Sequence, residues 1–221
     1  AAKKTKDTLL TNTKNKESTY QQLLADRLKK KQEVEAEISK FESELKTVID
    51  PNSLPATGKG VLSWPLDNVI ITQYFGNTAF ATKNSQVYGG KGHNGIDISA
   101  KIGTPIKAAL AGIITGTGDT DVTCTGASYG KWILVKHSNG LSTLYAHLSL
   151  IKVNPGQTVA TGDIIAYSGN TGYTTGPHLH FTLFATAGVE ISQLKSRVAG
   201  CGTYTVPLGS QSSYLNPLSY L

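Results

Sequence analysis

From Val61 to Phe184 the sequence alternates short apolar runs with turn-forming residues, and this pattern admits few folds. The runs are rich in Val, Ile, Thr and Tyr, which favour β-strands. Turn sequences such as Asn154-Pro155-Gly156 separate them at intervals of roughly 10–20 residues, as in all-β sandwiches and barrels. We therefore predict a mainly β, compact antiparallel sandwich or barrel-like domain. The runs are Ile106–Ala109, Gly112–Thr115, Trp132–Lys136, Ser142–Ala146, Thr158–Ala160, Ile164–Tyr167 and Leu179–Phe184.

Residues 18–49 have a different pattern and are predicted to form one long helix of the coiled-coil type. A capping box of Ser18 and Gln21 would begin it. The apolar stripe of this helix, which runs from Val34 to Val48, is narrow. Such a stripe suits a helix that pairs with another helix, self-associates, or lies on the domain that follows it. Residues 1–17 are polar, and we expect them to be frayed or to continue the coil. Apolar residues recur at the alternating spacings of an a/d seam: Val34, Ile38, Phe41, Leu45 and Val48.

Proline and glycine divide the chain. Residues 50–60 read as a linker, so we predict a helical coiled-coil segment at 1–49 and one domain at 61–221. No apolar run approaches the ~20 residues of a transmembrane helix. The chain contains no Met and its first residues lack an apolar stretch, so we expect a mature chain that has lost an export signal.

The formal net charge is +6. A basic surface favours an anionic partner such as a cell-wall polymer or a membrane, or only adds solubility. Nucleic acid is not expected, because Lys and Arg are scattered singly. Cys124 and Cys201 form an even pair, which in an exported protein suggests a disulfide; two free thiols are the alternative.

Histidines carry the candidate chemistry. His178 and His180 are expected to share one face of a predicted strand. Leu179, Phe181 and Leu183 are expected to point from its other face into the core. An extended chain would separate His93 from Asp97 by ~13 Å, so the Asn94-Gly95 pair must turn the chain for both to bind one ion. His147 closes a predicted strand at 143–147. Each pattern alone also has an ordinary structural explanation.

Together, two imidazoles and one carboxylate make a three-ligand zinc site with an open fourth position. Hydrolysis then needs a base. Glu190 is the one Glu after Glu44, and no HExxH motif is present, so a histidine base is indicated. Two histidines would bind zinc and two would act in catalysis. His137 is interpreted as an exposed turn residue. Spacing does not decide which histidine of 178 and 180 is the ligand.

Three segments resemble the motifs of lysostaphin-type (LytM-like) zinc metallopeptidases: Gly90–Ser99, Tyr145–Leu148 and Gly176–Phe181. The resemblance covers about Ser63 to Phe184 and extends to Asn216-Pro217-Leu218. It implies a compact antiparallel β fold with a groove over one zinc ion. It also implies that peptide cross-links or stem peptides of bacterial peptidoglycan are the substrate.

Carried over residue by residue, the resemblance implies that His93, Asp97 and His180 bind zinc and that His147 and His178 are catalytic. Tyr88 is a candidate oxyanion donor or an ordinary loop residue. Thr182 departs from the family, in which an acidic residue is common at that place. Residues 119–129 and 186–206 are expected to be long inserted loops that a Cys124–Cys201 disulfide joins beside the groove.

The resemblance implies an extracytoplasmic protein, periplasmic, wall-associated or secreted. Its leading function is zinc metalloendopeptidase. The alternative is a non-catalytic coiled-coil regulator that activates separate cell-wall amidases, and such regulators usually have damaged metal sites. A passive wall-binding module is a third reading. The coil could also cover the groove and inhibit it.

Overall fold

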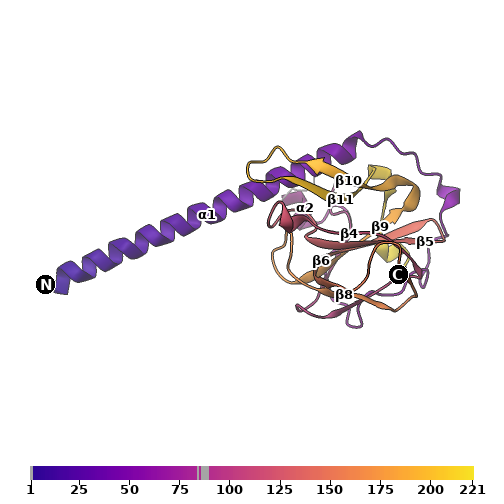
Figure 1. The fold of residues 1–221 in the computed structure, drawn as a ribbon, viewed down its shortest axis with the longest axis horizontal. Coiled ribbons are helices and arrows are strands. Elements are labelled where there is room, and N and C mark those ends of the chain that lie inside the picture. Colours follow the sequence, from indigo (N-terminus) through magenta and orange to yellow (C-terminus); the bar gives the residue numbers. More distant parts are fainter. Residues whose placement is uncertain (1, 84, 86–89) are drawn as a thin grey trace.

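The protein folds into a β domain from which one long helix projects (Figure 1). The structure is a computed structural model, and it describes residues 2–83, 85 and 90–221. Helix α1 spans Ala2–Glu44, and the short helix α2 spans Ala79–Lys83. The prediction of a mainly antiparallel β domain behind one long helix is confirmed. None of the described helices is long and apolar enough to cross a membrane.

Ten of the described strands form one antiparallel sheet, in the order β1-β2-β9-β6-β5-β4-β7 with β3, β8 and β12 attached at its side. A separate hairpin joins β10 to β11. The strands are β1 (Ile71–Gln73), β2 (Ile96–Ser99), β3 (Pro105–Lys107), β4 (Gly112–Asp119), β5 (Lys131–His137), β6 (Leu141–Ile151), β7 (Thr158–Val159), β8 (Ile164–Ser168), β9 (His178–Ala185), β10 (Val189–Lys195), β11 (Thr203–Gly209) and β12 (Tyr214–Leu215).

The alternating pattern of β9 is confirmed. Leu179, Phe181 and Leu183 are fully buried in the main hydrophobic core. Because side chains alternate across a strand, His178 and His180 lie on the opposite face. The prediction of a long loop at 186–206 is wrong in part, because most of this segment belongs to the hairpin β10–β11. Val, Ile, Leu and Tyr alternate there strongly enough to pair two strands.

The long helix differs from the predicted span 18–49 at both ends: residues 2–17 continue it, which was one of the two alternatives for this segment, and its C-terminal end at residue 49 was predicted too late. The helix begins at Ala2, because no Gly or Pro interrupts the first 44 residues. Ser18 is therefore an interior residue and not a cap. The helix ends at Glu44, before Val48-Ile49-Asp50-Pro51, where two β-branched residues and a following proline disfavour helical backbone.

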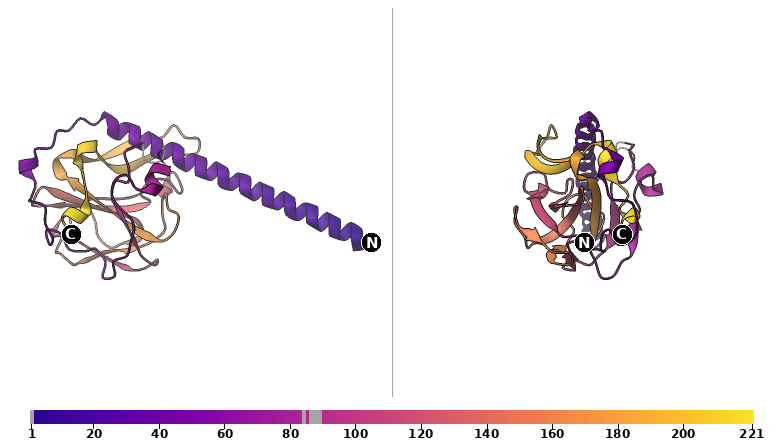
Figure 2. Two further views of the ribbon diagram at one scale, coloured as in Figure 1. Left: turned by 180° about the vertical axis from the view of Figure 1, so that it is seen from behind. Right: turned by 90° about the vertical axis from the view of Figure 1, so that its right-hand side faces the viewer.

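The C-terminal part of α1 packs on the domain, as Figure 2 shows for the end farthest from the N-terminus. Val34 and Ile38 are buried in a second hydrophobic cluster that includes Tyr204 and Val206 of β11. Phe41 and Val48 of the predicted seam remain 40% and 92% exposed. The buried stripe therefore follows the i, i+4 spacing of Val34 and Ile38, which continues to the buried Glu42.

A disulfide joins Cys124 to Cys201 across 77 residues. It ties the turn after β4 to the segment between β10 and β11. Closing so long a loop restricts the unfolded chain. We expect the double variant Cys124→Ser/Cys201→Ser to lose about 2–5 kcal/mol of unfolding free energy, measured by urea denaturation of oxidised protein. Equal unfolding free energies for the variant and the wild type would contradict this expectation.

Candidate metal centre

Strand pairing brings the first two residues of the site together. The register of β2 and β9 sets Asp97 opposite His180, and β6 sets Ala146 opposite His180 on the other side. His93 reaches the same place through a bridge to Gly76 and the turn that the sequence predicted at Asn94-Gly95. Gly95 must be glycine, because a Cβ atom there would lie 2.5 Å from the carbonyl oxygen of Phe181.

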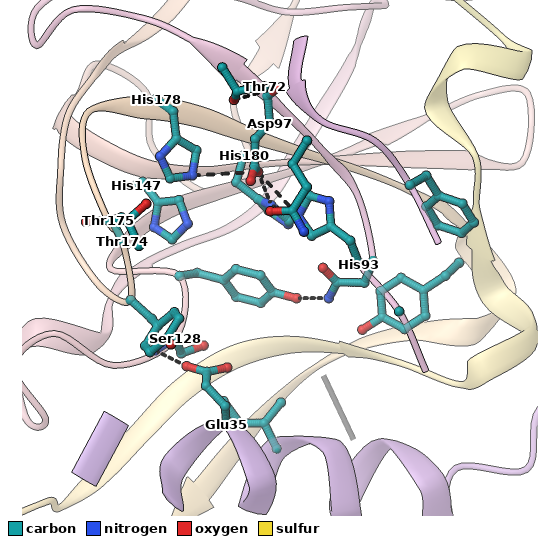
Figure 3. A pocket seen from close by; sticks show the side chains of 18 of the residues that line it. Glu35, Thr72, His93, Asp97, Ser128, His147, Thr174, Thr175, His178 and His180 are labelled. Atoms are coloured by element: carbon teal, nitrogen blue, oxygen red, sulfur yellow. Dashed lines mark hydrogen bonds and ion pairs between the residues drawn. The ribbon is translucent and has the colours of Figure 1, made fainter. Parts of the chain in front are cut away.

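Three candidate ligand atoms, from His93, Asp97 and His180, converge beside this turn. His180 Nδ1 lies 2.9 Å from Asp97 Oδ1 and 3.1 Å from His93 Nε2. His93 Nε2 lies 3.3 Å from Asp97 Oδ1. His93 and His180 are buried, and Asp97 is partly buried. The three side chains point toward one another at one side of a pocket (Figure 3).

The donor set fits zinc. Two imidazole nitrogens and one carboxylate oxygen are preferred zinc ligands, and tetrahedral bonds of about 2.0–2.2 Å hold neighbouring ligand atoms about 3.3–3.6 Å apart. The observed separations of 2.9–3.3 Å need only a small outward movement to admit the ion. Burial alone raises the pKa of Asp97, but hydrogen bonds and charge from His180 and His93 outweigh it and hold the pKa well below its usual value. The carboxyl group of Asp97 is therefore ionised and could bind a cation.

Backbone and side-chain partners orient the two imidazoles that could bind the ion. His93 Nδ1 donates to the carbonyl oxygen of Tyr74 at 3.1 Å, which leaves Nε2 for the ion. His180 Nε2 lies 2.8 Å from Thr182 Oγ1, which leaves Nδ1 for the ion. Partners of this kind set the tautomer and the ring orientation of metal-binding histidines. Thr182, where the family often has an acid, therefore still supplies an oxygen partner.

We expect Thr182→Val to weaken zinc binding by about 10–100-fold. Valine keeps the shape of this fully buried side chain but cannot hydrogen-bond His180. Competition with a chromogenic chelator measures the affinity. Thr182→Ser, which keeps the hydroxyl, is the matched control and should bind zinc like the wild type. Equal zinc affinity of the valine and serine variants would contradict this role for Thr182.

Two further imidazoles face the triad. The ring centroids of His147 and His178 lie 4.7 Å apart, and His147 lies 5.7 Å from His180. His147 Nδ1 donates to the carbonyl oxygen of Thr171 at 2.8 Å, and His178 Nδ1 donates to that of Gly176 at 2.8 Å. Because a carbonyl only accepts, both rings keep an Nε2 atom that can accept a proton.

His147 has an unusual backbone and environment. It does not end its strand as predicted, because β6 continues to Ile151. Its φ of 60° instead marks the point where β6 leaves β9 and begins to pair with β8. Burial and the neighbouring His178 and His180 lower the pKa of His147 well below its usual value. This imidazole is therefore neutral at pH 7.

Two further sequence predictions concern His137 and Tyr88. His137 is not an exposed turn residue: it is 2% exposed at the end of β5. Its ring lies 3.0 Å from the carbonyl oxygen of Ala111 and 2.9 Å from Thr143 Oγ1. The strand simply extends to residue 137, and the turn begins at Ser138. Tyr88 lies outside the described residues.

The sequence allowed the helix to cover the groove, but it did not identify the residues of α1 that line this pocket. Glu35 and Glu42 of the helix line the same cavity of about 400 Å³ as the five candidate site residues. Tyr129 and Asn94 also line it, and Asn94 Nδ2 donates to the hydroxyl of Tyr129 at 3.0 Å. The position of Glu42 in the i, i+4 stripe of Val34 and Ile38 could have signalled this, since acids are rare on a buried face.

Residues 91–192 match the model of peptidase family M23. This segment is a peptidase family M23 domain. All five candidate site residues lie inside the matched M23 segment, and the resemblance found from the sequence is confirmed. M23 peptidases are zinc-dependent, in agreement with the His-Asp-His group described above.

The M23 domain has relatives that are named as peptidases. The DD-carboxypeptidase/endopeptidase Mpg of Neisseria meningitidis is 43% identical over 89 residues, 40% of this chain and 19% of that protein. The peptidoglycan DD-endopeptidase ShyA of Vibrio cholerae is 37% identical over 106 residues, 48% of this chain and 23% of that protein. The chain spans about a fifth of the length of these curated relatives. The catalytic domain of lysostaphin from Staphylococcus simulans is 28% identical, covering 69% of this chain and 91% of that one, with a TM-score of 0.49.

Proposed function

We propose that the protein is a zinc metalloendopeptidase that hydrolyses peptide cross-links or stem peptides of bacterial peptidoglycan. The observation that carries this proposal is the convergence of His93, Asp97 and His180, whose ligand atoms lie within 4.8 Å of one another, beside two more imidazoles in one pocket. In this proposal the triad binds one zinc ion per chain, and His147 and His178 act on the substrate. A purely structural zinc site has no need for an open, base-flanked position.

The proposed chemistry divides between the ion and the chain. When bound, zinc polarises a peptide carbonyl and acidifies a water molecule. The two proposed catalytic histidines then handle protons and charge. His147 is neutral, and its Nε2 can accept a proton from the attacking water. His178 Nε2 lies 3.6 Å from Asp97 Oδ1, close to the triad. Once this ring has taken up a proton at Nε2, its second N–H can donate to the oxygen that gains charge.

The substrate and the compartment are proposed from the relatives. Mpg and ShyA are named for cleaving peptidoglycan or D,D-peptide bonds. Because peptidoglycan lies outside the cytoplasm, we propose an extracytoplasmic location in the periplasm, the cell wall or the medium. A disulfide is typical of these oxidising compartments.

We also propose a division of the chain into residues 1–49, a linker at 50–60 and the peptidase domain at 61–221. In the first of these, Tyr20, Leu23, Leu24 and Leu28 are 42–56% exposed along α1. This exposed apolar stripe supports a helical partner or self-association through residues 18–49. Sedimentation of the chain and of a Leu24→Lys/Leu28→Lys variant tests it. Identical monomeric sedimentation of the two would rule out self-association.

The direct test of the function uses zinc-loaded protein and cross-linked muropeptides of defined structure. We expect cleavage products by mass spectrometry, loss of cleavage with a chelator, and recovery when zinc is returned. The mass of the products also identifies the bond. Intact muropeptides at every enzyme concentration, with zinc bound, would favour the non-catalytic regulator.

A further inference from the structure

Two residues of the described chain other than glycine have a left-handed backbone: Ser128, with φ of 52°, and His147, with φ of 60°. Such a conformation costs about 1–3 kcal/mol and persists only where surrounding contacts hold it. The two residues are linked, because the amide of His147 donates to the carbonyl oxygen of Tyr129 at 2.9 Å. The strained backbone at a proposed catalytic histidine thus continues into the loop that contains Ser128.

Helix α1 holds this loop. The amide of Ser128 donates to Glu35 Oε1 at 2.6 Å, and Ser128 is 5% exposed. Burial raises the pKa of Glu35 to about 7, although the hydrogen bond from Ser128 opposes the shift. Figure 3 shows Glu35 reaching from the helix to Ser128, across the pocket from the histidine cluster. A partly buried carboxyl group in this position would be unfavourable without such a partner.

The loop that contains Ser128 also positions the ring of His147, through the segment at Thr171. The carbonyl oxygen of Ser128 accepts from the amide of Tyr173 at 2.8 Å, which fixes the segment that includes Thr171. The carbonyl oxygen of Thr171 accepts from His147 Nδ1. Gly130 packs so closely on this segment that a Cβ atom would lie 2.3 Å from the carbonyl carbon of Thr171. Both the main chain and the ring of His147 are therefore held by segments that meet at Ser128.

We propose that Glu35 is a positioning residue: by accepting the Ser128 amide, it fixes the loop that orients His147. This inference rests on the proposed function, in which His147 takes part in the reaction. The C-terminal end of α1 would then help to orient a residue of the proposed active centre. It also predicts that removing the helix lowers activity, in contrast to the expectation that the coil inhibits the groove.

The helix supplies a matched control. Glu37 Oε1 accepts from the amide of Arg197 at 2.7 Å, and Glu37 Oε2 accepts from Ser196 Oγ at 2.7 Å. This is the same kind of carboxylate–amide contact between α1 and the domain, but it reaches the segment after β10 and not the loop of His147. Loss of either contact should loosen the helix, and only loss of the Glu35 contact should affect His147.

The experiment compares Glu35→Ala, Glu35→Gln and Glu37→Ala in the full chain. We expect Glu35→Ala to lower kcat about 10–100-fold, with KM and zinc content within about 2-fold of the wild type. Glu35→Gln keeps the carbonyl acceptor and should restore kcat, and Glu37→Ala should leave kcat unchanged. Hydrogen exchange at the amides of Ser128 and His147 should accelerate in Glu35→Ala alone. If that variant does not fold, Glu35→Met keeps its volume without an acceptor and replaces it.

Three outcomes would overturn the inference. The first is a kcat for Glu35→Ala equal to that of Glu37→Ala. The second is a Glu35→Gln variant as slow as Glu35→Ala, since charge and not the hydrogen bond would then matter. The third is unchanged exchange at the His147 amide. An inactive wild type would refute the proposed function, whereas the exchange measurement would still test whether Glu35 holds the loop.

Discussion

Asp97→Ala is expected to leave the protein with neither bound zinc nor peptidase activity. The carboxylate is one of three ligand atoms, and its removal leaves two imidazoles whose ring nitrogens, 3.1 Å apart, have no anionic partner. Without the Lewis acid, the reaction loses several kcal/mol of transition-state stabilisation. We expect a loss of activity of about 10³-fold or more, measured on defined muropeptides together with zinc content by mass spectrometry.

The control for this variant is Asp67→Ala. Asp67 is 77% exposed and pairs with Lys107 at 2.5 Å on the surface. An exposed pair of this kind contributes little to stability, so this variant should keep both zinc and activity. An Asp97→Ala protein that retained one zinc ion and its full rate would remove Asp97 from the site.

His147→Asn is expected to lower kcat by about 10²–10⁴-fold, the range for loss of a general acid or base. Asparagine tolerates the left-handed backbone better than most residues, and residue 147 has a φ of 60°. The variant should therefore fold and bind zinc like the wild type while it lacks the imidazole. Kinetics, zinc content and thermal unfolding of the same preparation separate these effects.

The same variant decides between the enzyme and the regulator. A regulator of separate amidases needs no proton acceptor in its own pocket, so its effect on cell-wall digestion would not depend on His147. Unchanged digestion by His147→Asn would favour that alternative. A loss of digestion with zinc still bound would favour the peptidase.

The sequence limited the candidate metal site to few residues, and the structure brings the three proposed ligands, His93, Asp97 and His180, together. With five histidines and one late Glu, the combinations were limited. Strand alternation placed His178 and His180 on one face, and Gly95 allowed the turn to Asp97. The choice between His178 and His180 as a ligand needed the resemblance, because both face the same side of β9 and only the register with β2 separates them.

Contacts between segments far apart in the chain escaped prediction. The seam of α1 indicated an apolar stripe, but the burial of Val34 and Ile38 depends on β11, which lies more than 150 residues later. His137 looked like a turn residue because Ser138-Asn139-Gly140 follows it, and only the pairing of β5 with β4 and β6 buries it. Glu35 carries no local pattern that distinguishes it from the solvated acids of the same helix.

The most direct test is anomalous diffraction at the zinc edge from crystals of the zinc-loaded protein. The account predicts one zinc peak within about 2.0–2.2 Å of His93 Nε2, His180 Nδ1 and a carboxylate oxygen of Asp97, with His147 and His178 near the ion but not bound to it. A zinc peak ligated by His147 or His178, or one that lies away from these three side chains, would contradict it.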